Sequence, residues 1–396
     1  MRIVLVNKFW YLRGGAEKVA LVTKELLEKA GHQVEIFGMN HPKNLFTNKY
    51  FTDFIDYNQT SFWQKIKFGF RAIYNFQAKR NFAKLLDDFK PEVVHFHNIY
   101  HQLSCSIIAV AKKRKIKTVM TLHDYKFISP NYSLFHHGQV AQECVGGKYY
   151  RCILNNCMEN RAESLLATIE AYFVDIMRYK KMIDIYLSPS EFLRAKFIAA
   201  GFLPDKIEQV CNPLPESEFK TNHTDKNYIA YVGRLSKEKG VGFLLSAAKN
   251  LPNIQFKIIG DGPEKLDLEQ KSRNDKLANV EFVGEKHGAE LAELISDARL
   301  LVVPSVWYEN SPMSIIEAKA RAKIVVAFSI GGISELLPAE LLVEPQDVLG
   351  LTKKIKEWFE ASSSKRQEVG MNLQIEAQIE NGAENYLKKI LEVYSA

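Results

Sequence analysis

The sequence lacks any run of apolar residues long enough to cross a bilayer, and it contains little cysteine. It has 396 residues, of which 46% are hydrophobic and 25% charged, whereas a membrane-spanning helix needs about 20 consecutive apolar residues. The amino-terminal run MRIVLVNKFW is also too short for a secretory signal. Five cysteines without a CxxC pair are typical of a reduced protein rather than of a disulfide scaffold. We therefore expect a cytoplasmic globular protein.

Signatures of several enzyme classes are also absent. The chain has no Walker A sequence, no GxSxG elbow and no HExxH pair. The stretch IIGDGPE, residues 258–264, contains GxG but lacks the third glycine of a dinucleotide fingerprint. No hydrophobic strand ends in DxD, so we expect no metal cofactor. No DNA-binding motif is present, and we expect no nucleic-acid partner.

Positive charge is concentrated in the first half of the chain. Residues 1–220 contain 31 Lys and Arg against 21 Asp and Glu, although the whole chain has a net charge of only +7. Such a surface favours anionic lipid headgroups or an anionic acceptor. The alternative is an ordinary solubilising surface.

Short apolar runs alternate with helical patterns through most of the chain, which predicts parallel sheets covered by helices on both faces. The first series comprises RIVLV (2–6), QVEIF (33–37), VVHF (93–96), TVMTL (118–122) and DIYLS (184–188). The second comprises YIAYVG, QFKIIG, VEFVG, LLVVPS and IVVAFS. We predict an α/β protein with two doubly wound domains, residues 1–210 and 211–375, and a final helix over 376–396 that crosses back to the first domain.

Residues 61–86 mix basic and aromatic side chains within one helical pattern. Lys65, Lys67, Arg71, Lys79 and Arg80 are interleaved with Phe62, Trp63, Phe68, Phe70, Tyr74 and Phe76. This composition is typical of a helix at an anionic membrane surface. The alternative is a helix that packs its aromatic face into the domain core.

In the first half, the residues suited to chemistry follow the predicted strands, where ligands bind to open parallel sheets. Gly14 and Gly15 open the first predicted helix and would permit close approach to a phosphate. His97 and Asn98 follow one strand, and His123 and Asp124 follow the next. A histidine there serves as a hydrogen-bonding partner or a proton carrier, or is simply structural.

In the second half, VGRLSKEKG places Arg234 and Lys239 just after a strand, where two cations suit a diphosphate. In WYENSPMSIIEAKA, residues 307–320, Ser311 is expected to cap a helix that begins at Pro312. Its free N–H groups favour an anion. Glu309 and Glu317 flank the helix start and can accept hydrogen bonds from hydroxyls.

Residues 125–165 contain a cluster of potential metal ligands. Cys144, Cys152 and Cys157 lie near His136 and His137. A structural zinc site needs four ligands in orderly spacing, and the alternative is three free thiols in a loop.

The order of GGAE, TLHD, VGRLSKEKG, GDGP and E-x7-E along the chain is more specific than any one motif. With these motifs the sequence resembles the retaining family-4 glycosyltransferases, whose fold, called GT-B, has two facing Rossmann-like domains separated by a cleft. The resemblance covers essentially the whole chain and is most specific over residues 228–336. It implies transfer of a sugar from a nucleotide-sugar donor to a glycan or lipid-linked acceptor, in the cytoplasm or at the inner membrane face.

The resemblance also implies roles for the residues that match the family motifs. Arg234 and Lys239 would neutralise the departing diphosphate, Glu309 would hold sugar hydroxyls and Glu317 the ribose. His123 would position the reacting sugar, and His97, Asn98 and Asp124 would lie on the acceptor side. The remaining donor-site residues implied are Gly14, Gly15, Gly260, Ser311, Pro312, Met313 and Ser314.

Two other functions are compatible with paired Rossmann-like domains. A dinucleotide-dependent oxidoreductase would need a complete GxGxxG fingerprint with an acidic residue downstream, which this chain does not show convincingly. A non-catalytic scaffold that binds nucleotide sugars is the second alternative, and the intact candidate residues argue against it.

Overall fold

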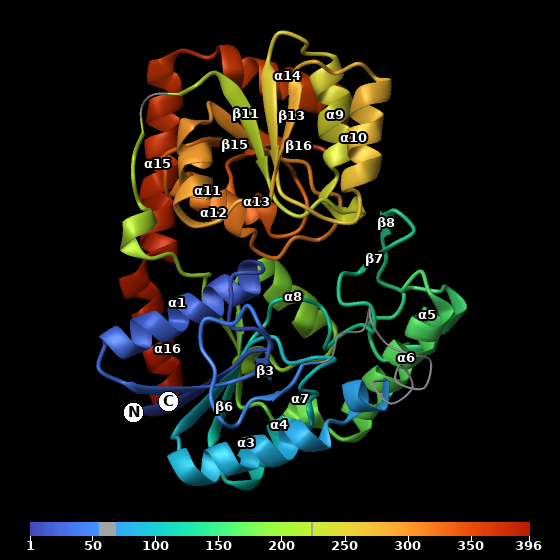
Figure 1. Cartoon of the computed structure of the whole chain (residues 1–396), viewed down its shortest axis with the longest axis vertical. Helices are drawn as coiled ribbons and strands as arrows, with labels where there is room; N and C mark the ends of the chain where they lie inside the picture. The colour runs from blue at the N-terminus through green and yellow to red at the C-terminus, as the bar shows by residue number, and fades with distance from the viewer. Residues whose placement is uncertain (55–68, 223–224) are drawn as a thin grey trace. The chain divides into compact units, whose positions relative to one another are not determined.

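Two six-stranded sheets, each with all its strands parallel, form the cores of two compact units (Figure 1). The computed structural model describes residues 1–54, 69–222 and 225–396. Unit 1 contains Met1–His137, Ala141–Pro213 and Tyr386–Ala396, and unit 2 contains Gly138–Val140 and Leu214–Asn385. The predicted architecture of two doubly wound parallel sheets is confirmed.

The sheet of unit 1 has the strand order β10-β9-β6-β5-β1-β2. Its strands are β1 Arg2–Val6, β2 Gln33–Phe37, β5 Val93–Phe96, β6 Lys117–Thr121, β9 Ile185–Ser188 and β10 Ile207–Gln209. Two-residue strands form two small separate sheets: β3 Met39–Asn40 with β4 Thr52–Asp53, and β7 Phe135–His136 with β8 Gln139–Val140. The order reverses direction between β1 and β5, so the ends of these two strands form a switch point suited to ligands.

Helices cover both faces of this sheet. They are α1 Gly15–Lys29, α3 Phe76–Phe89, α4 Ser106–Lys113, α5 Tyr150–Leu154, α6 Arg161–Ile176, α7 Tyr179–Met182, α8 Glu191–Ala199 and α16 Ala383–Ser395. Ile3 and Leu5 of β1 pack in one cluster with apolar residues of α1 and α16. On the other face, Phe96 of β5 packs against Phe82 of α3 with ring centroids 6.2 Å apart. Because side chains alternate between the two faces of a strand, the same strands contribute to a hydrophobic core on each face of the sheet.

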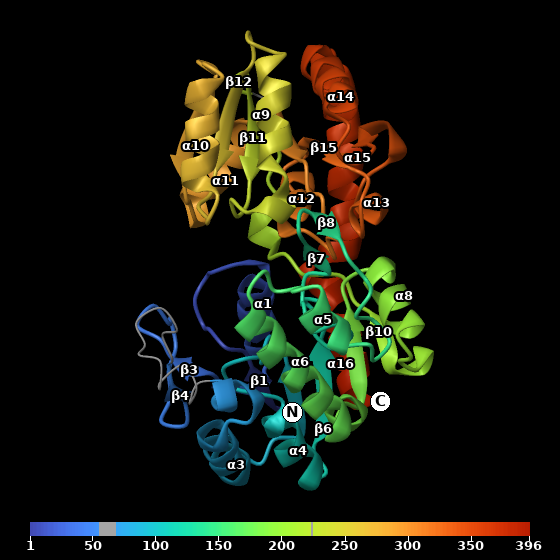
Figure 2. The ribbon, with the colours of Figure 1, turned by 90° about the vertical axis from the view of Figure 1, so that its right-hand side faces the viewer.

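The sheet of unit 2 has the order β13-β12-β11-β14-β15-β16. Its strands are β11 Tyr228–Val232, β12 Gln255–Ile259, β13 Val280–Gly284, β14 Leu300–Val303, β15 Ile324–Phe328 and β16 Leu342–Val343. Its helices are α9 Val241–Lys249, α10 Lys265–Asn274, α11 Gly288–Asp297, α12 Met313–Lys319, α13 Ile333–Leu336, α14 Val348–Glu360 and α15 Ser363–Asn381. Helix α9 packs against α10 and α14, while α12 packs against α11 and α15 (Figure 2). The sheet is therefore covered on both faces.

The carboxyl-terminal segment differs from the single helix predicted from about residue 376. Helix α15 ends at Asn381 and α16 begins at Ala383, with Gly382 in an extended conformation between them. Gly382 forms a parallel bridge with Leu214, whose N–H donates to the carbonyl of Asn381 over 2.8 Å. This pairing with a distant strand-like residue interrupts the helix. In the part of the chain that the structure describes, no helix is both long enough and apolar enough to cross a membrane.

Candidate active site

An ion pair between Lys239 and Glu309 joins two loops of unit 2. Lys239 lies in a short 3-10 helix after β11, and Glu309 lies in the loop after β14. Lys239 Nζ donates to Glu309 Oε1 over 2.7 Å, and Ser305 Oγ donates to the same oxygen over 2.7 Å. Glu309 is only 4% exposed, so these two donors, rather than bulk water, stabilise its charge. The pair brings together two of the residues predicted for the site.

The other predicted cation, Arg234, has a different environment. Its side chain is exposed and, within residues 1–54, 69–222 and 225–396, its guanidinium forms no ion pair or hydrogen bond. Lys239, by contrast, lies 5.1 Å above the ring centroid of Trp307 as well as beside Glu309. Such a cation–π contact adds to the stabilisation of the ammonium group. Arg234 is thus free to bind an anion, whereas Lys239 is held in place.

Close backbone contacts fix the loops that carry these residues. A Cβ atom at Gly260 would lie 1.9 Å from the carbonyl oxygen of Gly233, and one at Gly331 would lie 2.4 Å from that of Glu309. Gly331 has a φ of +63°, a conformation that favours glycine. Gly260, predicted as a donor-binding residue, has a structural role in packing the loops after β11 and β12.

The helix that carries Glu317 starts one residue later than predicted. Helix α12 begins at Met313, and its N-cap is Pro312, which provides no side-chain cap. The prediction that Ser311 caps a helix beginning at Pro312 was wrong, because Pro312 adopts an extended conformation with a ψ of 121°. Ser311 and Glu317 are buried, while Pro312, Met313 and Ser314 are half-buried.

Three histidine rings lie against one another in unit 1, His95 in β5 and His97 and His123 just beyond the carboxyl ends of β5 and β6. His97 Nδ1 lies 3.1 Å from His123 Nε2, so one of these nitrogens donates a hydrogen bond to the other. His95 lies against His97 with ring centroids 4.4 Å apart. Burial lowers the pKa of His123 to about 4 and that of His95 to about 3. All three rings are therefore in an environment that favours neutral imidazole.

Lys8, which the sequence did not identify, lies near His123, and Glu17 of the GGAE motif lies near Lys8. Burial lowers the pKa of Lys8. The negative charges of Glu17 and Asp124 act in the opposite direction and raise it, but by less. Burial likewise raises the pKa of Asp124 and of Glu17. Lys8 comes two residues after β1, and its N–H donates to the carbonyl of Asn98 over 3.0 Å. Its position beyond a buried strand was the signal that could have identified it.

The predicted glycine turn at the start of α1 is exposed, as expected for a ligand-binding turn. Gly14 is the N-cap residue of α1 in an extended conformation, and Gly15 is its first residue. Glu17 Oε2 lies 3.5 Å from where a Cβ of Gly14 would be. A carboxylate therefore already lies close to the N–H groups of this helix start, where a phosphate was expected.

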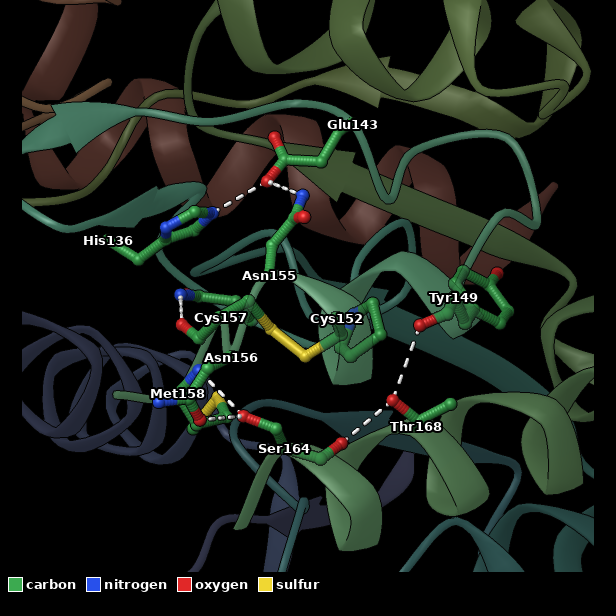
Figure 3. Close-up of a disulfide and its surroundings, with 12 residues drawn as sticks. His136, Glu143, Tyr149, Cys152, Asn155, Asn156, Cys157, Met158, Ser164 and Thr168 are labelled. Carbon is green, nitrogen blue, oxygen red and sulfur yellow. Dashed lines mark hydrogen bonds and ion pairs between the residues drawn. A yellow bond between two sulfur atoms is a disulfide. The ribbon is translucent and has the colours of Figure 1, made fainter. Parts of the chain in front are cut away.

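The cysteine-rich segment contains a disulfide rather than three free thiols (Figure 3). Cys152 and Cys157 are bonded, with their Cα atoms 4.8 Å apart, because the chain turns back after α5. Cys144 packs beside them as a free thiol. His136 Nε2–H donates to Glu143 Oε1 over 2.7 Å, and Glu143 also accepts from Asn155. The described residues include no group of His, Cys, Asp and Glu side chains arranged to hold a metal ion.

Part of the basic-aromatic stretch at 61–86, residues 61–68, lies outside the described residues. In the remainder, Phe82 is buried in the core, whereas Phe70 and Phe76 are 71% and 76% exposed. A groove of about 630 Å³ lies alongside α3 and α4, lined by Phe76, Gln77, Lys79, Arg80, Ala83, Val110, Lys113 and Arg114. In the described part of the stretch, Phe82 thus packs into the core, while Phe70 and Phe76 are exposed. Binding to an anionic membrane stays a prediction.

Two family models match the chain. Residues 13–218 match the model described as Glycosyltransferase Family 4, and residues 215–374 match the model described as Glycosyl transferases group 1. The first match alone covers more than half of the chain. The chain belongs to glycosyltransferase family 4. This membership favours sugar transfer over the oxidoreductase alternative.

This family-4 glycosyltransferase is similar to other proteins over most of its length. An uncharacterised 42.6 kDa protein in the cps region of Klebsiella pneumoniae is 26% identical over 355 residues, 85% of this chain and 87% of that protein. The alpha-monoglucosyldiacylglycerol synthase of Acholeplasma laidlawii is 24% identical over 82% of this chain and 80% of its own length. The crystal structure of Anabaena HepE in complex with UDP has a TM-score of 0.67 at 18% identity, and all of both chains is covered. The fold of this glycosyltransferase is therefore GT-B.

Proposed function

We propose that this glycosyltransferase moves a sugar, with retention of anomeric configuration, from a nucleotide-sugar donor to a hydroxyl of a glycan or lipid-linked acceptor. The observation that carries this proposal is the Lys239–Glu309 pair at the carboxyl end of a parallel sheet, in which the carboxylate is buried, with the exposed Arg234 in the same loop as Lys239. Two cations and a fixed carboxylate suit a ligand that is anionic at one end and rich in hydroxyls at the other.

The two cations would act on the leaving group. Breakage of the bond between the anomeric carbon and phosphate places negative charge on the diphosphate, and positioned cations stabilise that charge. Lys239 has three N–H donors and Glu309 uses one of them, so others remain for phosphate oxygens. Arg234 would bind two oxygens at once.

The acceptor proton would pass to the departing phosphate as the acceptor attacks from the same face. In this proposal Glu309 binds hydroxyls of the transferred sugar, Glu317 binds the ribose, and no metal takes part. A covalent intermediate on Glu309 is the less favoured route. Trapping a glycosylated Glu309 would support that route, and substantial turnover by Glu309→Gln would argue against it. A strong loss of activity in chelator would show that a metal is needed after all.

We further propose that the acceptor belongs to cell-surface polysaccharide or glycolipid synthesis, and that the enzyme works on the cytoplasmic face of the membrane. The names of two relatives support this, since one is a glycolipid synthase and another lies in a cps region. The groove between Lys79, Arg80 and Lys113, with the exposed Phe76 beside it, suits anionic headgroups and an apolar surface.

Calorimetric titration of UDP, GDP and ADP into the wild type and Glu317→Gln tests the donor site. We expect one nucleotide to bind, with UDP the first to try because Anabaena HepE was crystallised with it. Loss of one hydrogen bond to a charged acceptor should weaken binding by about 1.5–3 kcal/mol in the variant.

The matched control is Glu290→Gln, which removes an exposed carboxylate from α11 of the same unit. It should leave nucleotide affinity unchanged. If no nucleotide binds to folded wild type, the donor assignment fails. If a nucleotide sugar binds but no acceptor is glycosylated across a broad panel, the scaffold alternative is favoured.

A further inference from the structure

The three stacked histidines of unit 1 form a connected series of side chains. His97 Nδ1 lies 3.1 Å from His123 Nε2, and the two rings are stacked with centroids 5.4 Å apart. His95 also lies against the His97 ring, with 4.4 Å between centroids. His95 itself is held by Tyr394 of α16 at 2.6 Å and by Thr121 at 2.8 Å. Each ring orientation is thus restricted by its neighbours.

The rings are neutral near pH 7. Burial lowers the pKa of His95 to about 3 and that of His123 to about 4, and the positive charge of Lys8 lowers the pKa of His123 further. Burial also holds the pKa of His97 well below its usual value. A neutral imidazole has one N–H donor and one accepting nitrogen. The hydrogen bond between His97 and His123 therefore has two alternative directions.

In the first arrangement, His97 Nδ1–H donates to His123 Nε2, and His97 Nε2 is a bare lone pair. In the second, His123 Nε2–H donates to His97 Nδ1, and the proton of His97 must be on Nε2. His97 is 1% exposed, and its Nε2 has no hydrogen-bond partner among the described residues. The second arrangement therefore buries an N–H without a protein acceptor, whereas the first leaves only an unused lone pair. A buried N–H group that makes no hydrogen bond costs more free energy, and is rarer, than a buried lone pair that accepts none.

We propose that His97 is a positioning residue, which donates its Nδ1–H to His123 and thereby fixes His123 as the tautomer protonated on Nδ1. In this state His123 Nε2 is occupied as an acceptor. Nδ1, which carries the proton, is then the hydrogen-bond donor of the His123 ring.

This inference rests on the proposed function for its chemical consequence. A His123 whose accepting nitrogen is occupied cannot take the proton of the acceptor hydroxyl. It can donate a hydrogen bond to an oxygen atom instead. The role left for His123 in sugar transfer is therefore to orient an oxygen of a substrate, while the acceptor proton goes to the leaving phosphate.

The tautomer can be measured directly by NMR. The probe is the full-length protein labelled with ¹⁵N-histidine, in long-range ¹H–¹⁵N correlation spectra at pH 7. The signals of His123 are identified by their disappearance in His123→Gln. We expect the pattern of a neutral ring protonated on Nδ1. A neutral ring protonated on Nε2, or a charged ring, would overturn the proposal. This measurement needs no substrate, so it stands even if no sugar transfer is found.

Two variants of His97 test whether this residue sets the tautomer. His97→Asn keeps an N–H donor near the position of Nδ1, and His97→Phe keeps the ring but removes the donor. We expect His123 to remain protonated on Nδ1 in His97→Asn and to shift toward Nε2–H in His97→Phe. If His97→Phe leaves the His123 pattern unchanged, His97 does not set the tautomer. If His97→Phe fails to fold, a His97→Asn spectrum that differs from the wild type at His123 overturns the proposal in the same way.

Kinetics then connect the tautomer to the reaction. We expect kcat to fall by about tenfold to a hundredfold in His97→Phe, because a misoriented group near the reacting atoms costs that much. His97→Asn should stay within a few-fold of the wild type. The KM for the donor should hardly change in either variant, since Arg234, Lys239 and Glu317, which are proposed to bind the diphosphate and the ribose, lie in unit 2. Equal loss in both variants would indicate a structural role only.

Discussion

The ammonium group of Lys239 pairs with the buried carboxylate of Glu309, and in the proposed function it has a second task, binding the diphosphate of the donor. In Lys239→Ala, Glu309 keeps only the hydrogen bond from Ser305. Loss of one partner of a mostly buried pair should lower the free energy of unfolding by about 1–3 kcal/mol. Loss of a cation at the leaving group should lower kcat by about a hundredfold. Urea unfolding and steady-state kinetics measure the two effects.

A double variant separates these tasks. Lys239→Ala combined with Glu309→Gln removes the unpaired charge, so most of the lost stability should return while activity stays low. Lys237→Ala, in the same short helix but exposed, should change neither quantity. Recovery of activity in the double variant would contradict a role for Lys239 at the diphosphate.

The stacked histidines predict that acid destabilises unit 1. The folded-state pKa values of His95 and His123, about 3 and about 4, lie below the ordinary value of 6.5. The unfolded chain therefore binds protons first as the pH falls from 7 to 5, and unfolding becomes more favourable. For each ring, the free energy of unfolding should be lower by about 2 kcal/mol at pH 5 than at pH 7. Urea midpoints at the two pH values measure the loss.

A His95→Phe variant shows how much of this pH dependence comes from His95. It is expected to be less stable than the wild type at pH 7, because it loses the bonds to Tyr394 and Thr121. The further loss between pH 7 and pH 5 should be smaller by about 2 kcal/mol. An unchanged pH dependence would mean that His95 is not kept neutral by the fold.

Among the elements, the junction between α15 and α16 depends on a residue without a side chain. A Cβ at Gly382 would lie 2.3 Å from the carbonyl oxygen of Gln378, so Gly382→Ala must shift the end of α15. We expect a loss of about 1–3 kcal/mol in the free energy of unfolding. Gly242→Ala in α9 is the control, since nothing lies within 4 Å of its added Cβ. That substitution should be neutral or stabilising by up to about 1 kcal/mol.

The sequence predicted the long, strongly patterned elements well and the short ones poorly. β1, β2 and β5 were predicted at their observed limits. β1 and β5 are mostly apolar because they are buried on both faces, whereas β2, at the edge of the sheet, alternates apolar with polar residues. The three-residue strand β10 was missed, since Ile207–Gln209 contains only one buried apolar residue. The break at Gly382 was also missed, because it depends on pairing with Leu214, a long-range contact.

The candidate site was predicted through residues that follow strands. The pairs Lys239–Glu309 and His97–His123 were each predicted as members of the site, but not as direct contacts. The Cys152–Cys157 disulfide escaped prediction, because it depends on how the chain turns back after α5. Local sequence pattern contains little information about how a loop turns back on itself.

At the scale of the whole molecule, the excess of positive charge in residues 1–220 predicts binding to anionic vesicles. Lys79→Gln with Arg80→Gln removes two cations from the groove beside α3. At about 1 kcal/mol per basic residue near a charged surface, binding to phosphatidylglycerol vesicles should weaken by about thirtyfold. Co-sedimentation with and without anionic lipid measures this change.

Lys353→Gln with Lys356→Gln, two exposed cations on α14 of unit 2, is the matched control and should bind vesicles as the wild type does. Equal weakening by both pairs would indicate that net charge, rather than this surface, determines binding. Equal binding of the wild type to neutral phosphatidylcholine vesicles would remove the electrostatic explanation.

Both termini of the chain belong to unit 1, and the segment Leu214–Asn385 of unit 2 is continuous between them. The entry and exit of this segment lie side by side, since the N–H of Leu214 bonds to the carbonyl of Asn381 over 2.8 Å. In terms of gene architecture, the segment is an insertion into unit 1. Because its two ends lie close together, it can be replaced by another domain with similarly placed ends. Recombination could therefore replace the unit that carries Lys239 and Glu309 as a cassette, joined at two adjacent points, while the histidine-bearing unit is inherited unchanged.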